Sequence, residues 1–178
     1  MFQRSKERKP NRLKDFDYSQ NGEYFITVCV DDMKECLGEV KNREMILNKF
    51  GEIVKKCWLE ITQHFKEVEL DEFQIMPNHI HGIINIYSEK NNNNIVGDAH
   101  VRPLQDRTKM YLSKVIHGFK SASSKLIHQS GFKDFKWERS FYDHIIETEK
   151  ELDQIRDYII SNPSKWDEDR NNPKNLLK

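Results

Sequence analysis

Hydrophobic and polar positions follow two different periods along the first half of the chain. Residues 24–30 (YFITVCV) are β-branched and aromatic, which predicts a strand. Apolar residues recur every three or four positions over 49–65, which predicts a helix. Residues 68–76 and 80–87 predict two further strands, joined by a Pro-Asn turn. The first half therefore predicts a strand, a helix and a hairpin.

The second half predicts a loop, a helix, a strand and a final helix. Residues 88–106 include four consecutive asparagines and few apolar residues, so we expect a mobile loop. Residues 109–130 have an apolar side and a basic side at 100° per residue, which predicts a helix. Residues 137–146 predict a strand, and a capping box at 148–151 opens a helix that Pro163 stops.

This order of elements indicates the fold class. Strands joined by a tight turn must be antiparallel, which disfavours a doubly wound parallel sheet. We expect an α+β fold, a ferredoxin-like sandwich with a central antiparallel sheet and packed helices. A length of 178 residues suits one domain. We assign that domain to 1–178, with a basic arm at 1–15, the mobile loop at 88–106 and a loosely held polar tail at 164–178.

The composition excludes two classes of protein. With 37% hydrophobic residues, 7 Gly and 5 Pro, the chain is too apolar and too poor in chain-breaking residues to be disordered. No apolar stretch approaches the ~20 residues that cross a bilayer, and the charged residues 1–15 lack a signal-peptide pattern. Cys29, Cys36 and Cys57 are unclustered, which favours reduced thiols. We therefore expect a cytoplasmic protein with no membrane partner.

The charges are segregated although they cancel overall. The chain has 29 basic and 29 acidic residues, hence a formal net charge of zero. Residues 1–14 hold six basic residues and one acid, and residues 107–133 hold six basic residues and no acid. Such clusters contact phosphates without reading sequence, although a solvated helix face is the alternative. We predict a DNA-binding surface that includes Lys109, Lys114, Lys120, Lys125, Arg8 and Arg12.

Two pairs of residues are candidates for chemistry. His79 and His81 are two positions apart on a predicted strand, so both imidazoles project from the face opposite to Ile80. Two neutral imidazoles form half of a divalent-metal site, but strands also carry such pairs by chance. Tyr158 and Asn162 are four positions apart on the last helix and share a face. The alternative for that pair is a packing tyrosine and a helix-ending asparagine.

Ordered segments along the chain resemble one family. Residues 76–82 (MPNHIHG) resemble the His-hydrophobic-His strand of the single-tyrosine HUH transposases, most closely the branch of REP-associated tyrosine transposases (REP, repetitive extragenic palindrome). Residues 12–19 (RLKDFDYS) with 24–27 (YFIT) are similar to the N-terminal signature of that branch. Residues 137–144 (WERSFYDH) and 156–163 (RDYIISNP) are similar to its pre-helix strand and catalytic helix.

The resemblance implies a site and an activity. His79, His81 and Asn162 would bind Mg²⁺ or Mn²⁺, with Asn162 standing where the wider family has Gln. Tyr158 would be the nucleophile of a transposase that nicks and joins single-stranded DNA at hairpin (palindromic) elements through a 5′-phosphotyrosine. A phenol with a pKa of about 10 is a poor nucleophile at neutral pH, so this chemistry needs metal or base activation. The protein would act as a monomer or a homodimer.

Two alternative functions stay open. A phosphoesterase acting on small nucleotides could use the two histidines without Tyr158 or a basic helix. A DNA-hairpin-binding module without catalysis is the second alternative, although the presence of all four site residues argues against it. Asp143 and His144 precede the last helix closely, where they could orient a water or a metal ligand.

Overall fold

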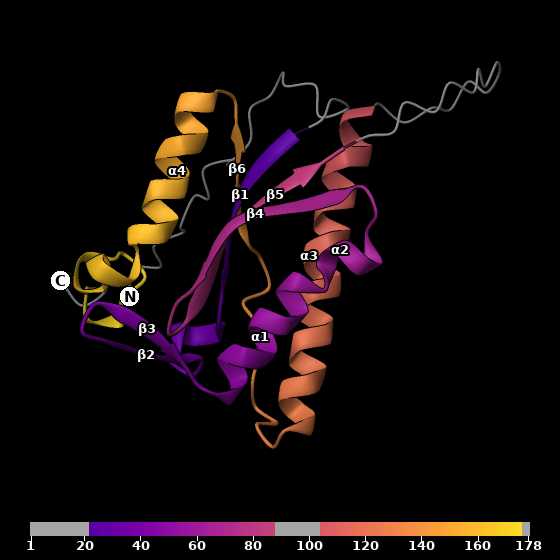
Figure 1. Ribbon diagram of the computed structural model, residues 1–178. Helices are drawn as coiled ribbons and strands as arrows, with labels where there is room; N and C mark the ends of the chain where they lie inside the picture. Colours follow the sequence, from indigo (N-terminus) through magenta and orange to yellow (C-terminus); the bar gives the residue numbers. More distant parts are fainter. Residues whose placement is uncertain (1–21, 88–103, 176–178) are drawn as a thin grey trace, which may run out of the picture.

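The computed structural model describes residues 22–87 and 104–175, with the backbone alone for 104–110. Four strands form one sheet in the order β4–β5–β1–β6 (Figure 1). Every neighbouring pair of these strands is antiparallel, which confirms the predicted α+β fold with a central antiparallel sheet. The strands are β1 (Gly22–Cys29), β4 (Val68–Ile75), β5 (His79–Ile86) and β6 (Tyr142–Ile146).

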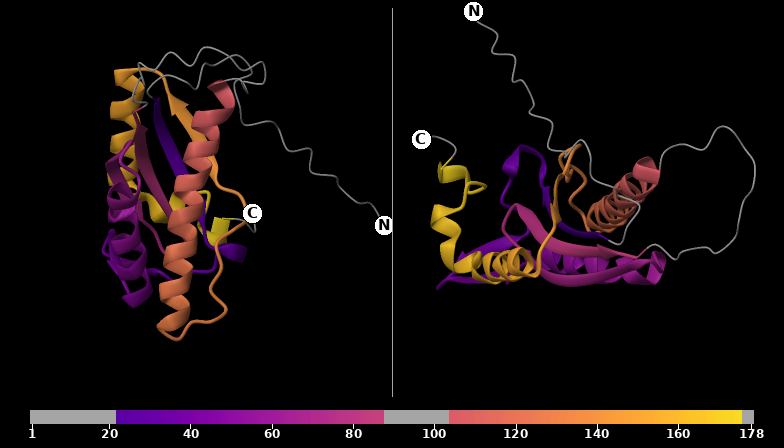
Figure 2. Two further views of the ribbon diagram at one scale, coloured as in Figure 1. Left: turned by 90° about the vertical axis from the view of Figure 1, so that its right-hand side faces the viewer. Right: turned by 90° about the horizontal axis from the view of Figure 1, so that it is seen from above.

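Helices cover both faces of this sheet (Figures 1 and 2). One face carries α1 (Lys49–Leu59), α2 (Ile61–His64) and α3 (Leu104–Gln129), and the other carries α4 (Glu149–Ser161). The helix predicted over 49–65 is interrupted at Glu60, which ends α1 and precedes α2. No helix in the described ranges has the length and apolar character needed to span a membrane.

A small ribbon and a short turn complete the first half. The ribbon pairs β2 (Gly38–Lys41) with β3 (Glu44–Leu47), and its turn residues Asn42 and Arg43 have positive φ angles of 52° and 67°. Two consecutive positive φ angles are typical of a type I′ hairpin turn. A 3-10 turn, η1 (Asp31–Met33), follows β1.

The larger apolar core lies between the sheet and the helices α1 and α3. Trp58 of α1 is fully buried there and rests on Gly82 of β5. A Cβ atom at Gly82 would be 2.4 Å from the Trp58 ring, so a side chain at this position would clash. The glycine that follows the two histidines in sequence is therefore required by packing on the opposite face.

The strand predicted over 137–146 is shorter than expected. Only Tyr142–Ile146 joins the sheet, and Trp137 makes an isolated bridge to Val30. The indole Nε1 of Trp137 donates to Ser123 Oγ at 2.9 Å, so this end of the segment packs into the core instead. The ammonium of Lys120 donates to the carbonyls of Glu138 and Ser140, both at 3.0 Å, which holds the segment outside the sheet.

The C-terminal segment is ordered through residue 175, so the prediction of a loosely held tail over 164–178 is wrong for most of its length. It forms two 3-10 turns, η2 (Pro163–Glu168) and η3 (Pro173–Asn175). Trp166 and Asn172 are buried, and Asn172 Nδ2 donates to the Trp166 carbonyl at 2.9 Å. Short polar side chains thus form hydrogen bonds with the backbone carbonyls of these turns. A polar composition alone does not indicate that such a segment is folded.

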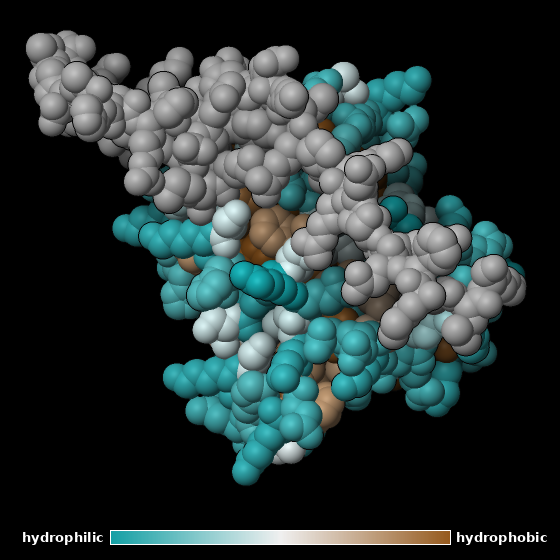
Figure 3. Space-filling view, turned by 180° about the vertical axis from the view of Figure 1, so that it is seen from behind, coloured by the Kyte–Doolittle hydropathy of each residue, from teal (hydrophilic) through white to brown (hydrophobic). Residues whose placement is uncertain are grey.

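Two predicted segments fall wholly or mostly beyond the described ranges. The basic arm at 1–15 lies outside them, as does most of the predicted loop at 88–106. The helix α3 begins at Leu104, inside the predicted loop. Within the part shown, the face opposite to the view of Figure 1 is largely hydrophilic (Figure 3).

Candidate active site

Two buried histidines on β5 face α4. His79 and His81 are fully buried, and their Nε2 atoms are 3.0 Å apart. The remaining ring nitrogens are held by polar neighbours: His79 Nδ1 lies 2.7 Å from Asn78 Oδ1, and His81 Nδ1 lies 2.8 Å from Thr27 Oγ1. Thr27 is the register partner of His81 on β1, so strand pairing places the hydroxyl. Both imidazoles are therefore fixed in orientation.

The histidines are neutral, because burial opposes a positive charge. Burial lowers the pKa of His79 to about 4, and burial together with His79 lowers the pKa of His81 well below its ordinary value. An amide oxygen only accepts, so His79 Nδ1 donates to Asn78 and leaves a lone pair on Nε2. Such a hydrogen bond to the far nitrogen is the usual arrangement of a metal-binding histidine.

The spacing of the two Nε2 atoms suits a shared cation. Two ligands each about 2.1 Å from one ion, at a right angle, are about 3.0 Å apart. The observed separation is 3.0 Å. The same separation is that of a hydrogen bond between the two nitrogens, so this pair can share either a proton or a cation.

Tyr158 reaches this pair from α4 of the same chain. Its hydroxyl oxygen lies 3.3 Å from His81 Nε2, and the two ring centroids are 5.3 Å apart. Phe25 of β1 stacks on His81 and meets the Tyr158 ring edge-on. The tyrosine is 37% exposed, so its ring is accessible as well as close to the histidines. Burial, followed by the charge of Asp169, raises the pKa of the phenol.

The position of Tyr158 depends on how α4 is attached to the sheet. Arg156 donates twice to Asp71 of β4, through Nε at 3.0 Å and Nη2 at 2.6 Å. At the start of the helix, Thr148 Oγ1 accepts from the Glu151 backbone N–H at 3.2 Å. Leu152 and Ile159 fill a small apolar cluster against the strands. The helix is therefore fixed at two points. One is its capped N-terminus, and the other is Arg156, two residues before the tyrosine.

Asp143 and His144, which the sequence suggested as residues that could orient a water or a metal ligand, lie on β6. His144 Nε2 lies 2.7 Å from Glu151 Oε1, so it supports the cap of α4. Asp143 is the register partner of Ile26. Neither belongs to the group of potential metal ligands found among the described residues.

Asn162 is hydrogen-bonded to Asp169, a residue that the sequence did not indicate as part of the site. Asn162 is 2% exposed, and its Nδ2 donates to Asp169 Oδ2 at 2.9 Å. Its Oδ1 is buried and has no hydrogen-bond partner among the described residues. His79, His81 and Asp169 offer ligand atoms that all lie within 4.8 Å of one another. The sequence signal was weak, because Asp167, Glu168 and Asp169 are adjacent acids and spacing does not choose among them.

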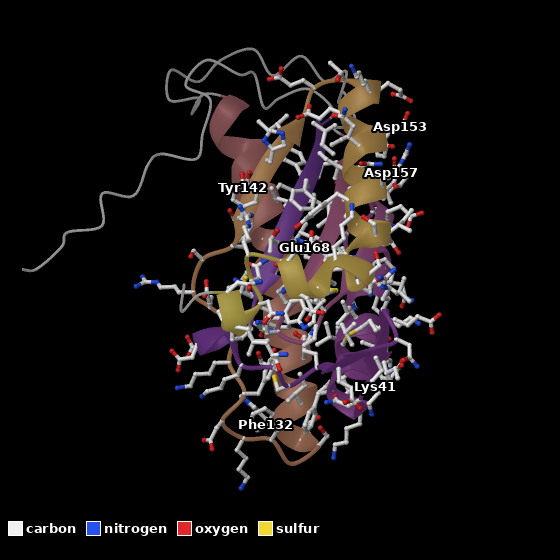
Figure 4. All side chains as sticks on the ribbon, turned by 90° about the vertical axis from the view of Figure 1, so that its left-hand side faces the viewer. Lys41, Phe132, Tyr142, Asp153, Asp157 and Glu168 are labelled. Atoms are coloured by element: carbon white, nitrogen blue, oxygen red, sulfur yellow. The ribbon has the colours of Figure 1, made fainter. Side chains whose placement is uncertain are left out.

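The C-terminal segment forms one wall of the site. Viewed from the α4 side, η2 crosses in front of the strands beside the end of α4, with Glu168 labelled on it (Figure 4). Trp166 of η2 packs near His79, with ring centroids 6.0 Å apart. Asn78 Nδ2 donates to the carbonyl of Asn171 at 2.8 Å, which ties the segment to the turn before β5.

The predicted DNA-binding residues do not gather at the histidine pair. Lys114 and Lys125 are exposed on α3, which packs on the opposite face of the sheet. Lys120 is engaged by two backbone carbonyls, and burial lowers its pKa. The side chain of Lys109 and both Arg8 and Arg12 lie outside the part that the structure describes.

Two known proteins are similar to this chain in sequence. No family model matches the chain. An uncharacterized protein of Haemophilus influenzae is 39% identical over 166 residues, which cover 92% of each chain. A second H. influenzae protein, provisionally named a REP-associated tyrosine transposase, is 25% identical over 149 residues, or 84% of this chain and 74% of the other.

A solved structure has the same fold. It is described as a REP-associated tyrosine transposase bound to a REP hairpin, and it matches with a TM-score of 0.55 at 19% identity. The match covers 87% of this chain and 73% of the other. The chain therefore shares the α+β fold of that solved structure. The sequence match at 25% identity runs along most of both chains, so the chain is similar in sequence as well as in fold to proteins described as REP-associated tyrosine transposases.

Proposed function

We propose that this protein cleaves and rejoins single-stranded DNA at hairpin elements, with Tyr158 as the nucleophile and a divalent cation held by His79, His81 and Asn162. The observation that carries the proposal is the approach of the phenol to the imidazole pair, 3.3 Å from His81 Nε2 within one chain. The Tyr158 side chain is 37% exposed, so a DNA strand could reach the phenol while it lies beside the histidines.

The donor atoms suit a divalent cation. Two neutral imidazoles are oriented toward each other, and the Asn162 amide oxygen is buried without a partner. Imidazole nitrogen and amide oxygen together suit Mn²⁺ or Mg²⁺. Such an ion would act as a Lewis acid on the scissile phosphate and stabilise its developing charge.

The proposed reaction is a transesterification at phosphorus. The Tyr158 oxygen forms a bond to the phosphorus, the bond from phosphorus to the 3′ oxygen breaks, and the phenol proton is transferred to that leaving oxygen. The product is a 5′-phosphotyrosine and a free 3′-OH. Attack of a 3′-OH on the phosphotyrosine reverses the step and restores the phenol, so no external energy source is needed.

Hairpin DNA is the proposed partner because the related solved structure is described as bound to a REP hairpin. One chain contains the histidines and the tyrosine together, so the proposal needs no helix exchanged between subunits and is compatible with a monomer or a homodimer. Lys114 and Lys125, which lie on the far face of the sheet, would contact phosphates away from the cleavage point. We place this activity in the cytoplasm, where DNA is accessible.

A covalent-adduct assay tests this function. Labelled single-stranded DNA with a hairpin is incubated with the protein and Mn²⁺, and the products are separated on a denaturing protein gel. The wild type should carry the label, Tyr158→Phe should not, and EDTA should abolish labelling. Tyr142→Phe, which changes a second aromatic residue of the same face, is the matched control. Label on Tyr158→Phe would exclude this residue as the nucleophile.

A further inference from the structure

A buried carboxylate lies beside the two histidines. Asp169 is 8% exposed, and one of its oxygens falls within 4.8 Å of ring nitrogens of both His79 and His81. We propose that Asp169 is a further protein ligand of the divalent cation, an inference that rests on the proposed function for the use of a metal. The centre would then combine two imidazoles, one amide oxygen and one carboxylate.

The hydrogen bonds of Asp169 come only from neutral groups. Its Oδ2 accepts from Asn162 Nδ2 at 2.9 Å, and its Oδ1 accepts from the Asn171 backbone N–H at 2.6 Å. Both donors are neutral, and the carboxylate forms no salt bridge with any described residue. A buried carboxylate is unfavourable without a cation beside it. A divalent ion at the two imidazoles would supply that charge.

The same carboxylate determines which way the Asn162 amide points. Its NH₂ group must face Asp169 Oδ2, because the reverse orientation would oppose two acceptors. The amide oxygen is thereby turned elsewhere, where it is buried without a partner. The Asp169 carboxylate thus orients the amide whose oxygen is the other proposed oxygen ligand.

The ligand atoms of His79, His81 and Asp169 are nearly close enough to bind one ion. Two ligands on opposite sides of one ion are about 4.2 Å apart, since each bond is about 2.1 Å. The ligand atoms here all lie within 4.8 Å of one another, so a closure of at most roughly half an ångström is needed. The Asp169 backbone N–H donates to the Trp166 carbonyl at 3.1 Å, and Trp166 packs near His79, so the end of η2 fixes where the carboxylate lies.

The test measures Mn²⁺ binding without DNA, by the loss of the electron paramagnetic resonance signal of free Mn²⁺. The proteins are wild type, Asp169→Asn, Asn162→Ala and the double variant, with Asp167→Asn as an exposed acidic control on the same segment. We expect Asp169→Asn to weaken Mn²⁺ binding at least about tenfold, and to weaken it further in the Asn162→Ala background. Asp167→Asn should bind like the wild type.

Two results would overturn the proposal. One is wild-type Mn²⁺ affinity in Asp169→Asn. The other is no added loss in the Asn162→Ala background, which would make Asp169 a positioning residue for the amide. Thermal melting in EDTA shows that each variant is folded; if Asp169→Asn is not, Asp169→Ser replaces it, because a hydroxyl still accepts from Asn162.

The titration is independent of DNA cleavage. A failure of Asp169 as a ligand would leave the covalent-adduct result unchanged. A failure of the wild type to form the adduct would leave the Mn²⁺ titration unchanged.

Discussion

The two faces of the central sheet differ in what they bury. The face toward α1 and α3 buries a large apolar cluster that includes Trp58, Ile80 and Phe119. The face toward α4 buries a small apolar cluster around Phe25 and also the polar groups of the site. Both faces are built from the same strands, since successive strand residues point to opposite sides.

Neighbouring residues of β5 face the two different environments. Ile80 lies in the large apolar core, while its neighbours His79 and His81 project into the polar site. Burying polar groups lowers stability unless they are paired, and here the pairing is incomplete, because the Asn162 amide oxygen has no partner. The large core therefore compensates for a face that buries polar groups with incomplete pairing. Substitutions on the two faces should have different consequences.

The largest effect on stability is expected on the α1 and α3 face. Trp58→Ala removes a fully buried indole and leaves a cavity over Gly82, which should lower the free energy of unfolding by about 3–5 kcal/mol. Urea denaturation followed by far-UV circular dichroism measures this. Leu59→Ala, at an adjacent position that is 47% exposed, should change it by less than about 1 kcal/mol. Equal losses in the two variants would contradict the difference between the faces.

The next effect is expected on the α4 face and concerns activity. His81→Ala removes one of the two facing Nε2 atoms, so adduct formation with hairpin DNA in Mn²⁺ should fall at least about 100-fold. His64→Ala, an exposed histidine on α2, is the control and should retain activity. A fall in His81→Ala that is matched by a comparable loss of folded protein in urea would show that this face, too, serves mainly stability.

The sequence was sufficient to predict features that depend on local periodicity. Alternation along β5 places His79 and His81 on one face, and the i, i+4 spacing places Tyr158 and Asn162 together on α4. The hairpin turn before β5 identifies neighbouring antiparallel strands, which leads to the α+β fold. Each of these inferences uses residues within one element or one turn.

Features that depend on tertiary contacts could not be predicted. Asp169 lies at the site only because η2 packs near His79. Residues 163–169 have no hydrophobic periodicity from which this packing could be predicted. The basic side of α3 was correctly expected to be exposed at Lys114 and Lys125, but a helical pattern does not say which face of a sheet the helix covers. Lys120 was expected to contact DNA phosphates, but its ammonium donates to two carbonyls distant in sequence.

A smaller effect is expected where α4 is attached to the sheet. The Arg156 side chain lowers the pKa of Asp71 below its ordinary value of 3.8. A carboxyl whose pKa is lowered by folding stabilises the fold above its unfolded pKa, and this contribution disappears as the pH falls through the folded value. Asp71→Asn should therefore lower the free energy of unfolding by about 1 kcal/mol at pH 7, and this difference should shrink below pH 3.8.

Urea titrations at pH 7, 5 and 3 measure this pH dependence. Asp153→Asn is the control, because Asp153 also contacts Arg156, at 3.2 Å, but its side chain is 68% exposed. Its effect should be smaller at every pH. A wild-type to Asp71→Asn difference that stays constant down to pH 3 would show that the ion pair does not contribute.

The smallest effect is expected for the exposed lysines of α3, and it decides whether the far face takes part in DNA binding. Each phosphate contact contributes about 0.7–0.9 to the slope of log Kobs against log salt concentration. The variant with both Lys114→Ala and Lys125→Ala should therefore reduce that slope by about 1.4–1.8 in hairpin-DNA titrations between 50 and 200 mM salt. Lys55→Ala, on an exposed position of α1, should leave it unchanged. An unchanged slope in the double variant would mean that the basic side of α3 is only solvated, and that DNA is held entirely by the α4 face and by residues outside the described ranges.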